Sequence, residues 1–292
     1  MTPTHRPTRC LIHLLLLATL GLSPVARGGT LAMFRTPLGE LDVELFDQEK
    51  PITVQNFLSY VASGVYSNMF LHRCVPGFIV QGGGFFVTNP FTAPAIEPVP
   101  QFAPITNEFN VGPRLANTYG TLAMAKVSGA TNSATAQWFF NLADNSTNLD
   151  NQNGGFTVFG RVVGGTNVLN RFNDTSGTNG ITEVDFSGVL GAPFDTLPIL
   201  YHGQTNVTYA DLIYTQVSVL RLQVTLDAGG RELSWNSVSN RLNTVEFATH
   251  LPPTWQTLVS TPGTGGPLQA TDPATNSPTR FYRVRIDFSA AN

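Results

Sequence analysis

The most informative segment of this 292-residue chain reads Phe70-Leu71-His72-Arg73-Cys74-Val75-Pro76-Gly77-Phe78-Ile79-Val80-Gln81-Gly82-Gly83-Gly84. Its apolar run and glycine-rich end are typical of a β-strand followed by a tight loop. Because alternate side chains of a strand share a face, Arg73 and Gln81 are expected to point the same way. A kink at Pro76-Gly77 would bring Phe78 to that face. Two interpretations follow: these groups form a site beside aromatic surface, or the arginine pairs with an acid and the aromatic rings are core.

The residues before this segment predict a hairpin and a helix. Residues 31–35 and 40–45 have the pattern of two strands around the turn Thr36-Pro37-Leu38-Gly39, and the second strand alternates polar and apolar residues. A helix is expected from Pro51 to Gly64, because proline suits the first helical turn and glycine suits the C-terminal cap. Its apolar face follows the spacing i, i+3, i+4 and i+7 and consists of Val54, Phe57, Leu58 and Val61.

The chain after this segment is broken into short apolar runs by Gly, Pro and Asn as far as residue 159, which predicts further strands. Residues 88–104 contain five prolines and little charge, so we expect a surface loop there. A second, short helix is expected to begin at Thr166, and residues 211–220 predict a closing strand. Residues 173–208 are rich in Gly, Asn and Thr and predict no particular element.

The composition changes near residue 220. Four later segments have strand patterns, and Gly, Pro, Ser and Thr linkers separate them: residues 220–226, 232–235, 245–248 and 281–286. We therefore expect two domains, residues 30–220 and a small all-β domain over residues 221–292. Its Trp235, Trp255 and Tyr282 could form the domain's core or bind a glycan or a partner protein.

The first 28 residues have the pattern of a secretory signal peptide. Arg6 and Arg9 precede an apolar run over residues 11–22, and Ala26-Arg27-Gly28 places small residues at a cleavage position. An uncleaved N-terminal anchor is the alternative interpretation. Cleavage would leave a periplasmic or secreted protein that has no stable insertion in the membrane.

Composition limits the chemistry of the expected mature chain. Cys74 is its single cysteine, so an internal disulfide is excluded, and we expect this residue to be a small core residue. The five histidines of the full sequence lack the spacing of metal ligands. The full sequence has a formal net charge of −3 and only two lysines, Lys50 and Lys126, which argues against a nucleic-acid partner.

Two further segments accompany the first. One runs from Gly120-Thr121-Leu122-Ala123-Met124-Ala125-Lys126 to Asn132-Ser133-Ala134-Thr135-Ala136-Gln137-Trp138-Phe139-Phe140-Asn141-Leu142, and the other joins Asn148-Leu149-Asp150 to Phe156-Thr157-Val158-Phe159-Gly160-Arg161-Val162. In this order and spacing, the three segments resemble the cyclophilin family of peptidyl-prolyl cis/trans isomerases, over about residues 30–220. The Asn-Ser-Ala-Thr and Asn-Leu-Ala-Asp stretches resemble its bacterial branch. The tail more loosely resembles a small β-sandwich module of exported bacterial proteins.

This resemblance implies a mainly β fold: an eight-stranded antiparallel barrel capped by two helices, with the substrate groove on the outside of the barrel. Arg73 would be the catalytic arginine. Gln81 and Gln137 would hold the substrate backbone, and Ala125 and Lys126 would contribute main-chain contacts. The resemblance also implies a proline pocket, which would be lined by Phe78, Ile79, Met124, Phe139, Leu149 and Phe156.

The sequence departs from the family at several of these positions. Asn148 stands where animal members often have Trp, and Phe156 where His or Tyr is frequent. Ile79 replaces a frequent Met and conserves volume, and Trp138 replaces a frequent Phe and is expected on the core side. None of these changes affects Arg73 or Gln81.

The implied reaction is rotation about an X-Pro bond in exported polypeptides. No bond is broken, so we expect no metal and no cofactor. An arginine that donates to the imide nitrogen would favour the twisted transition state. The alternative is a non-catalytic module that binds proline-containing peptides, anchored to an envelope or glycan partner by the C-terminal domain. A third interpretation, an adhesion or scaffold protein, would place the function in the tail.

Overall fold

The computed structural model describes residues 30–89, 93–220, 222–227, 230–237, 242–251, 253–264, 267–274 and 279–287. The predicted signal peptide, residues 1–28, lies outside the described residues. No helix in the described ranges is long and apolar enough to cross a membrane. The elements up to residue 220 are β1 (Leu31–Thr36), β2 (Gly39–Leu45), α1 (Pro51–Ser63), β3 (Arg73–Val75), β4 (Ile79–Gly82), β5 (Phe85–Thr88), β6 (Ala95–Pro98), β7 (Thr121–Met124), β8 (Trp138–Asn141), α2 (Ser146–Leu149), β9 (Val158–Gly164), α3 (Thr166–Arg171), β10 (Ile181–Val184), α4 (Ser187–Leu190), η1 (Phe194–Thr196), β11 (Leu197–Leu200), η2 (Tyr209–Asp211) and β12 (Gln216–Leu220).

The hairpin and both helices form where the sequence predicts them. β1 and β2 pair antiparallel, and α1 begins with a proline in its first turn. The helix ends at Gly64, whose φ of 74° lies in the left-handed region that glycine tolerates, and the Gly64 N–H donates to the Val61 carbonyl. α3 begins at Thr166, as expected.

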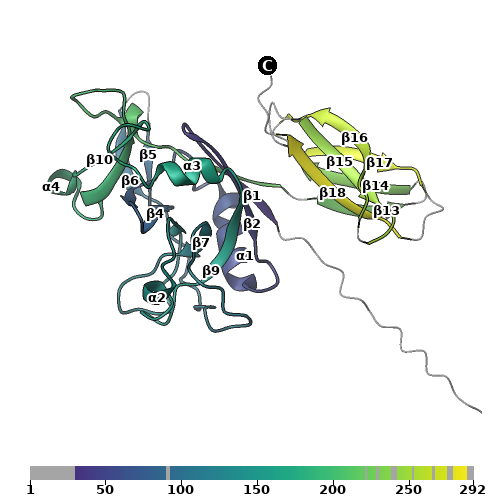
Figure 1. The fold of residues 1–292 in the computed structure, drawn as a ribbon, viewed down its shortest axis with the longest axis horizontal. Coiled ribbons are helices and arrows are strands. Elements are labelled where there is room, and N and C mark those ends of the chain that lie inside the picture. The colour runs from purple at the N-terminus through teal and green to yellow at the C-terminus, as the bar shows by residue number, and fades with distance from the viewer. Residues whose placement is uncertain are drawn as a thin grey trace, which may run out of the picture.

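Eight strands form one antiparallel sheet in the order β12-β1-β2-β9-β7-β8-β4-β3 (Figure 1). The residues just before its two edge strands hydrogen-bond to each other: the Leu71 N–H donates to the Ile213 carbonyl and the Thr215 N–H to the Met69 carbonyl. The sheet therefore curls into a barrel, and α3 lies against β2 and α1 against β12. This arrangement confirms the predicted fold class.

The barrel interior is an aromatic and aliphatic core. Phe34 packs edge-on against Trp138 and Phe140, with ring centroids 5.0 and 5.1 Å apart. Trp138 is fully buried, in agreement with its expected core position. Cys74 also lies in this core, where burial raises the pKa of its thiol to about 12. A thiol in that state does not act as a nucleophile at neutral pH.

The prediction of a surface loop over residues 88–104 is partly wrong. β6 pairs with β5 in a hairpin, because Val87, Ile96 and their neighbours can bury an apolar face despite the surrounding prolines. Residues 173–208, which the sequence left unassigned, form β10, α4, η1 and β11. The β5–β6 hairpin and the elements within residues 173–208 pack together in a second core, which includes Phe70, Phe194 and Leu212.

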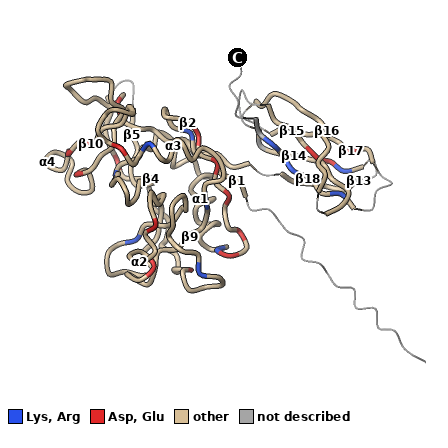
Figure 2. Tube along the Cα trace, in the orientation of Figure 1, with Lys and Arg blue, Asp and Glu red and all other residues tan. Residues whose placement is uncertain are grey.

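The C-terminal elements are six strands in two three-stranded sheets (Figure 1): β13 (Leu222–Asp227), β14 (Gly230–Asn236), β15 (Leu242–Ala248), β16 (Gln256–Pro262), β17 (Pro267–Asp272) and β18 (Phe281–Asp287). The sequence patterns identify four of them and miss β16 and β17, which are rich in Pro, Thr and Ser. Trp235, only 2% exposed, is core. Tyr282 packs against the same core and donates its hydroxyl to Asp272, whereas Trp255 stacks on the Arg283 guanidinium. Figure 2 shows acidic and basic residues scattered along the described chain, without a basic stripe.

Candidate active site

Four side chains form one row across the sheet, on the face that points away from the barrel interior. Arg73 of β3 lies opposite Gln81 of β4, Gln81 opposite Phe139 of β8, and Phe139 opposite Ala123 of β7. The adjacent row, one residue further along each strand, is Cys74, Val80, Phe140 and Leu122, and it belongs to the barrel core. Because side chains alternate between faces, the first row must lie on the outside.

The row exists because the segment around Arg73 is a hairpin. The sequence pattern suggested one kinked strand, but β3 and β4 are separate strands joined by the turn at Pro76-Gly77. The Phe78 N–H closes this turn by donating to the Val75 carbonyl, and Gly77 has a φ of 70°. Arg73 and Gln81 share a face as predicted, but as cross-strand neighbours, which brings them closer together than eight residues along one strand would allow.

A buried apolar cluster, here called the apolar wall, includes Phe139 and the residues next to this row. Phe139 and Leu149 are 3% and 4% exposed, and Ile79 packs with them. Phe156 meets Phe139 edge to face, with centroids 5.9 Å apart and an angle of 70° between the rings. The same cluster also contains the predicted site residues Phe78 and Ala125, and Ala123 of the row.

Arg73 is half-buried at the end of the row. Its guanidinium makes no hydrogen bond or ion pair with any described residue, which weakens the alternative that this arginine serves only to pair with an acid. Next to it, the Gln81 amide donates to the Gln137 side-chain oxygen at 2.7 Å. The arrangement presents one permanent cation and two linked amides beside an apolar surface.

Met124, which the resemblance placed in the proline pocket, is not part of this wall in the structure. It is 2% exposed and packs in the barrel core with Leu122, since strand alternation turns it inward. Ala123, which sequence reasoning missed, occupies the outward position; the register of β7 against Phe139 would have revealed it. The Ala125 main-chain N–H donates to the Gln137 carbonyl, so this N–H is not open to a bound peptide.

His72 is a second residue that sequence reasoning did not place at the site. It is fully buried, and burial together with the Arg73 charge lowers the pKa of its imidazole to about 3, so the ring is neutral. A Cβ at Gly84 would lie 2.9 Å from the His72 ring and 3.0 Å from the Gln137 amide carbon. Glycine at this position therefore lets the Gln137 amide pack close to the imidazole.

Lys126 touches the site through its side chain. Its ammonium nitrogen donates to the Asn153 and Gly155 carbonyls at 2.6 and 2.7 Å. It also lies 4.8 Å from the centroid of the Phe156 ring. The resemblance implied only main-chain contacts for this residue.

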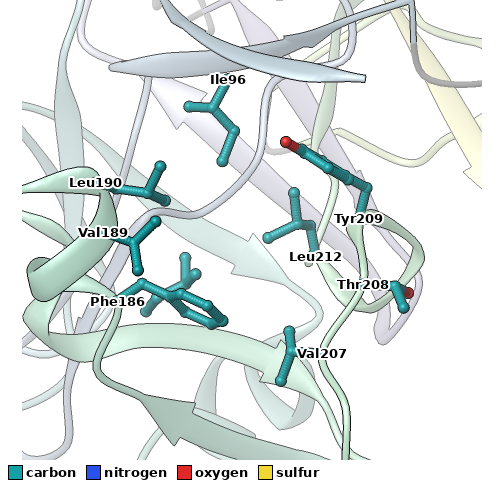
Figure 3. A pocket seen from close by; sticks show the side chains of 9 residues that line it. Ile96, Phe186, Val189, Leu190, Val207, Thr208, Tyr209 and Leu212 are labelled. Carbon is teal, nitrogen blue, oxygen red and sulfur yellow. The ribbon is translucent and has the colours of Figure 1, made fainter. Parts of the chain in front are cut away.

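A separate apolar pocket of about 170 Å³ lies between β6, α4 and η2 (Figure 3). Ile96, Phe186 and Leu212 line it, and the Tyr209 ring stands at one side. None of the predicted site residues borders this pocket, so it is distinct from the row that contains Arg73.

Comparisons with known proteins cover the same part of the chain. A family model described as cyclophilin type peptidyl-prolyl cis-trans isomerase/CLD matches residues 31–186. The peptidyl-prolyl cis-trans isomerase of Acinetobacter baylyi is 40% identical over 158 residues, which cover 54% of this chain and 79% of that protein. Peptidyl-prolyl cis-trans isomerase B of Escherichia coli is 41% identical over 142 residues, covering 47% of this chain and 80% of that protein.

A solved structure is also similar. It is a cyclophilin type peptidyl-prolyl cis-trans isomerase of Cryptosporidium parvum in the presence of the dipeptide Ala-Pro, 27% identical, with a TM-score of 0.39, covering 50% of this chain and 85% of that one. The family match spans every predicted site residue, from Arg73 to Phe156, and ends before most of the residues that line the separate apolar pocket.

Proposed function

The chain belongs to the cyclophilin-type peptidyl-prolyl cis-trans isomerase family, and from this premise we propose that it rotates X-Pro bonds of exported polypeptides in the groove beside Arg73. The observation that carries the proposal is the registered row of Arg73, Gln81 and Phe139, with a guanidinium that no described residue engages. The apolar wall next to this row suits a proline ring, and the linked amides of Gln81 and Gln137 suit a peptide backbone.

The reaction needs a twisted amide rather than a nucleophile. Rotation about an X-Pro bond faces a barrier of about 20 kcal/mol, because resonance holds the bond planar. In the proposed mechanism the Arg73 guanidinium donates to the imide nitrogen as that nitrogen loses its planarity. The interaction is strongest in the transition state and so lowers the barrier. The aromatic wall excludes water, which strengthens the interaction.

Turnover of a proline tetrapeptide by the purified mature chain tests this function. In a protease-coupled assay, the wild type should convert the cis peptide far faster than the uncatalysed rate, which has a time constant of about tens of seconds. Binding of the peptide without acceleration would instead support the alternative, a non-catalytic module. The presence of Arg73, whose guanidinium has no hydrogen-bond or ion-pair partner among the described residues, favours catalysis over that alternative.

Export is a further part of the proposal, and it is supported by the sequence of residues 1–28. A positive start, an apolar run and small residues at the predicted cleavage position are the features of a signal peptide. We expect the chain to accumulate in the periplasm of a Gram-negative host or in its medium, with a mature N-terminus close to residue 29. Full-length protein retained in the cytoplasm would exclude this part of the proposal.

We expect residues 30–220 to fold and act alone, and the C-terminal strands to affect location or choice of client, for example through an envelope or glycan partner. All the proposed groove residues lie before residue 220. The C-terminal strands have a core of their own around Trp235 and Val245, against which Leu220 packs.

Truncation at about residue 222 should therefore leave tetrapeptide turnover within about twofold of the full mature chain, because no groove residue is removed. The measurement is turnover, with circular dichroism as the control for folding. A folded but inactive product would contradict this division of labour. An insoluble product would show that the barrel depends on the C-terminal strands for its stability.

A further inference from the structure

We propose that Lys126 is a positioning residue of the proline pocket: its ammonium group clamps the turn at residues 153–155 and thereby fixes the Phe156 ring against Phe139. This inference rests on the proposed function of the groove. It assigns a task to the side chain of a residue for which the resemblance implied only main-chain contacts.

The clamp consists of two short charge-assisted hydrogen bonds. The Lys126 nitrogen lies 2.6 Å from the Asn153 carbonyl oxygen and 2.7 Å from the Gly155 carbonyl oxygen. The Asn153 amide returns a bond to the Val127 carbonyl at 2.9 Å. Bonds therefore run in both directions between the end of β7 and the turn, and they hold the two segments together.

The turn at residues 153–155 has a left-handed backbone, and its carbonyl groups accept hydrogen bonds from the Lys126 and Asn107 side chains. Asn153, Gly154 and Gly155 have φ values of 51°, 73° and 76°, so three successive residues are left-handed. A Cβ at Gly155 would lie 2.1 Å from the Phe109 ring, which makes glycine necessary there. The Asn107 amide shares the task, since it donates to the Gly154 and Gly155 carbonyls. Glycine adopts this conformation readily, so Asn153 is the one residue of the three whose left-handed backbone depends on the contacts that hold the turn.

Phe156 follows the turn directly, so the clamp sets its position. Its main chain is fixed by a bond from its own N–H to the Leu149 carbonyl, at 3.1 Å, and by a bond from the Asn117 amide to its carbonyl, at 2.9 Å. Its ring contacts both the Lys126 ammonium, 4.8 Å from the ring centroid, and the Phe139 ring. Loss of the ammonium would remove the cation–π contact and both carbonyl bonds at once, and would free one wall of the pocket.

The clamp should depend on pH, because it requires the protonated form of Lys126. Burial alone lowers the pKa of its ammonium to about 8, and no charged group contributes to this shift. The groups that face it are the Asn153 and Gly155 carbonyls and the Phe156 ring. The cation is therefore present at pH 7 and is lost as the pH rises through about 8, which should weaken peptide binding in the same range.

The test compares Lys126→Met and Lys126→Arg with the wild type in tetrapeptide binding, in kcat and KM, and in amide hydrogen exchange. We expect Lys126→Met to raise KM and the peptide Kd about 5- to 10-fold, with kcat changed less than about twofold, because pocket geometry is shared by ground and transition states. Lys126→Arg should stay within about threefold of the wild type, because the charge and the donors remain.

Two further readouts separate positioning from general stability. The wild-type peptide Kd should rise about threefold between pH 7 and pH 9.5, whereas Lys126→Arg should show no such change, since a guanidinium stays charged. Exchange of the Gly155 and Phe156 amide protons should accelerate in Lys126→Met at an unchanged melting temperature. Arg161→Met is the matched control, because this exposed cation pairs only with Glu44 at the barrel surface among the described residues, and its loss should leave all these quantities unchanged.

Unchanged Kd, KM and exchange in a folded Lys126→Met protein would overturn the proposal, as would a large loss of kcat at constant KM. Failure of the proposed function is a different result. In that case the wild type itself would lack turnover, while the exchange of Gly155 and Phe156 would still report whether Lys126 clamps the turn.

Discussion

Replacement of Arg73 by Ala should lower kcat/KM for a proline tetrapeptide about 100-fold, which corresponds to the loss of one preorganised donor worth about 3 kcal/mol in the transition state. The guanidinium is half-buried at the end of the outward row, and the substitution removes no hydrogen bond or ion pair between Arg73 and another described residue. The fold should therefore persist, and peptide binding should change little. Thermal melts and a peptide titration serve as controls.

Two companion variants distinguish the proposed role of Arg73 from a general disturbance of the groove. Arg73→Lys should rescue poorly, because an ammonium group lacks the planar, bidentate geometry of a guanidinium. Phe139→Ala should weaken binding as well as turnover, because this ring belongs to the apolar wall, which both ground and transition states contact in the proposed mechanism. Near-normal turnover by a folded Arg73→Ala protein would refute the mechanism and favour the binding-module alternative.

Replacement of Glu108 by Ala should lower the free energy of unfolding by about 3–5 kcal/mol, the range for breaking a buried charge network. Glu108 is 1% exposed, and its carboxylate accepts hydrogen bonds from the Ile52 N–H, the Thr53 N–H and the Thr53 hydroxyl. It thus caps the N-terminus of α1 from a loop more than 50 residues away in sequence. Its negative charge also opposes the lowering of the Lys50 pKa that burial causes, and Lys50 is itself 1% exposed.

Urea denaturation of the wild type and of three variants, Glu108→Ala, Glu108→Gln and Glu44→Ala, measures this effect. Glu44→Ala is the matched control, because Glu44 forms an exposed pair with Arg161 that should contribute less than about 1 kcal/mol. Glu108→Gln should fall between the two, since an amide keeps one acceptor oxygen but loses the charge. Equal stability of Glu108→Ala and Glu44→Ala would contradict the view that the buried carboxylate anchors α1.

Local chemistry explains which parts of the fold the sequence predicts. Pro51 and Gly64 bound α1 because proline fits the first helical turn and glycine fits a left-handed cap. The alternation in β2 identifies the hairpin in the same way. β6 was missed because its pairing with β5 depends on burial against Phe194 and Leu212, more than 90 residues away, and no local pattern encodes that contact.

In the candidate site, too, the sequence predicts what depends on local patterns and misses what depends on contacts between distant segments. Arg73, Gln81 and Phe139 could be named from their motif, but the row that joins them is set by the register of four strands. The core position of Met124 could not be foreseen for the same reason, since the direction of one side chain depends on whether its strand position is odd or even. The clamp on Phe156 was equally invisible, because it requires the left-handed turn at residues 153–155 to approach the end of β7.

Exchange spectroscopy of a proline peptide at equilibrium, with substoichiometric protein, tests the central claim most directly because one sample reports both binding and rotation. The wild type should bring cis/trans exchange from about tens of seconds to well below a second, and Arg73→Ala should perturb the peptide resonances similarly while exchange stays close to the uncatalysed rate. Exchange that the wild type does not accelerate, or that folded Arg73→Ala accelerates equally, would contradict the account.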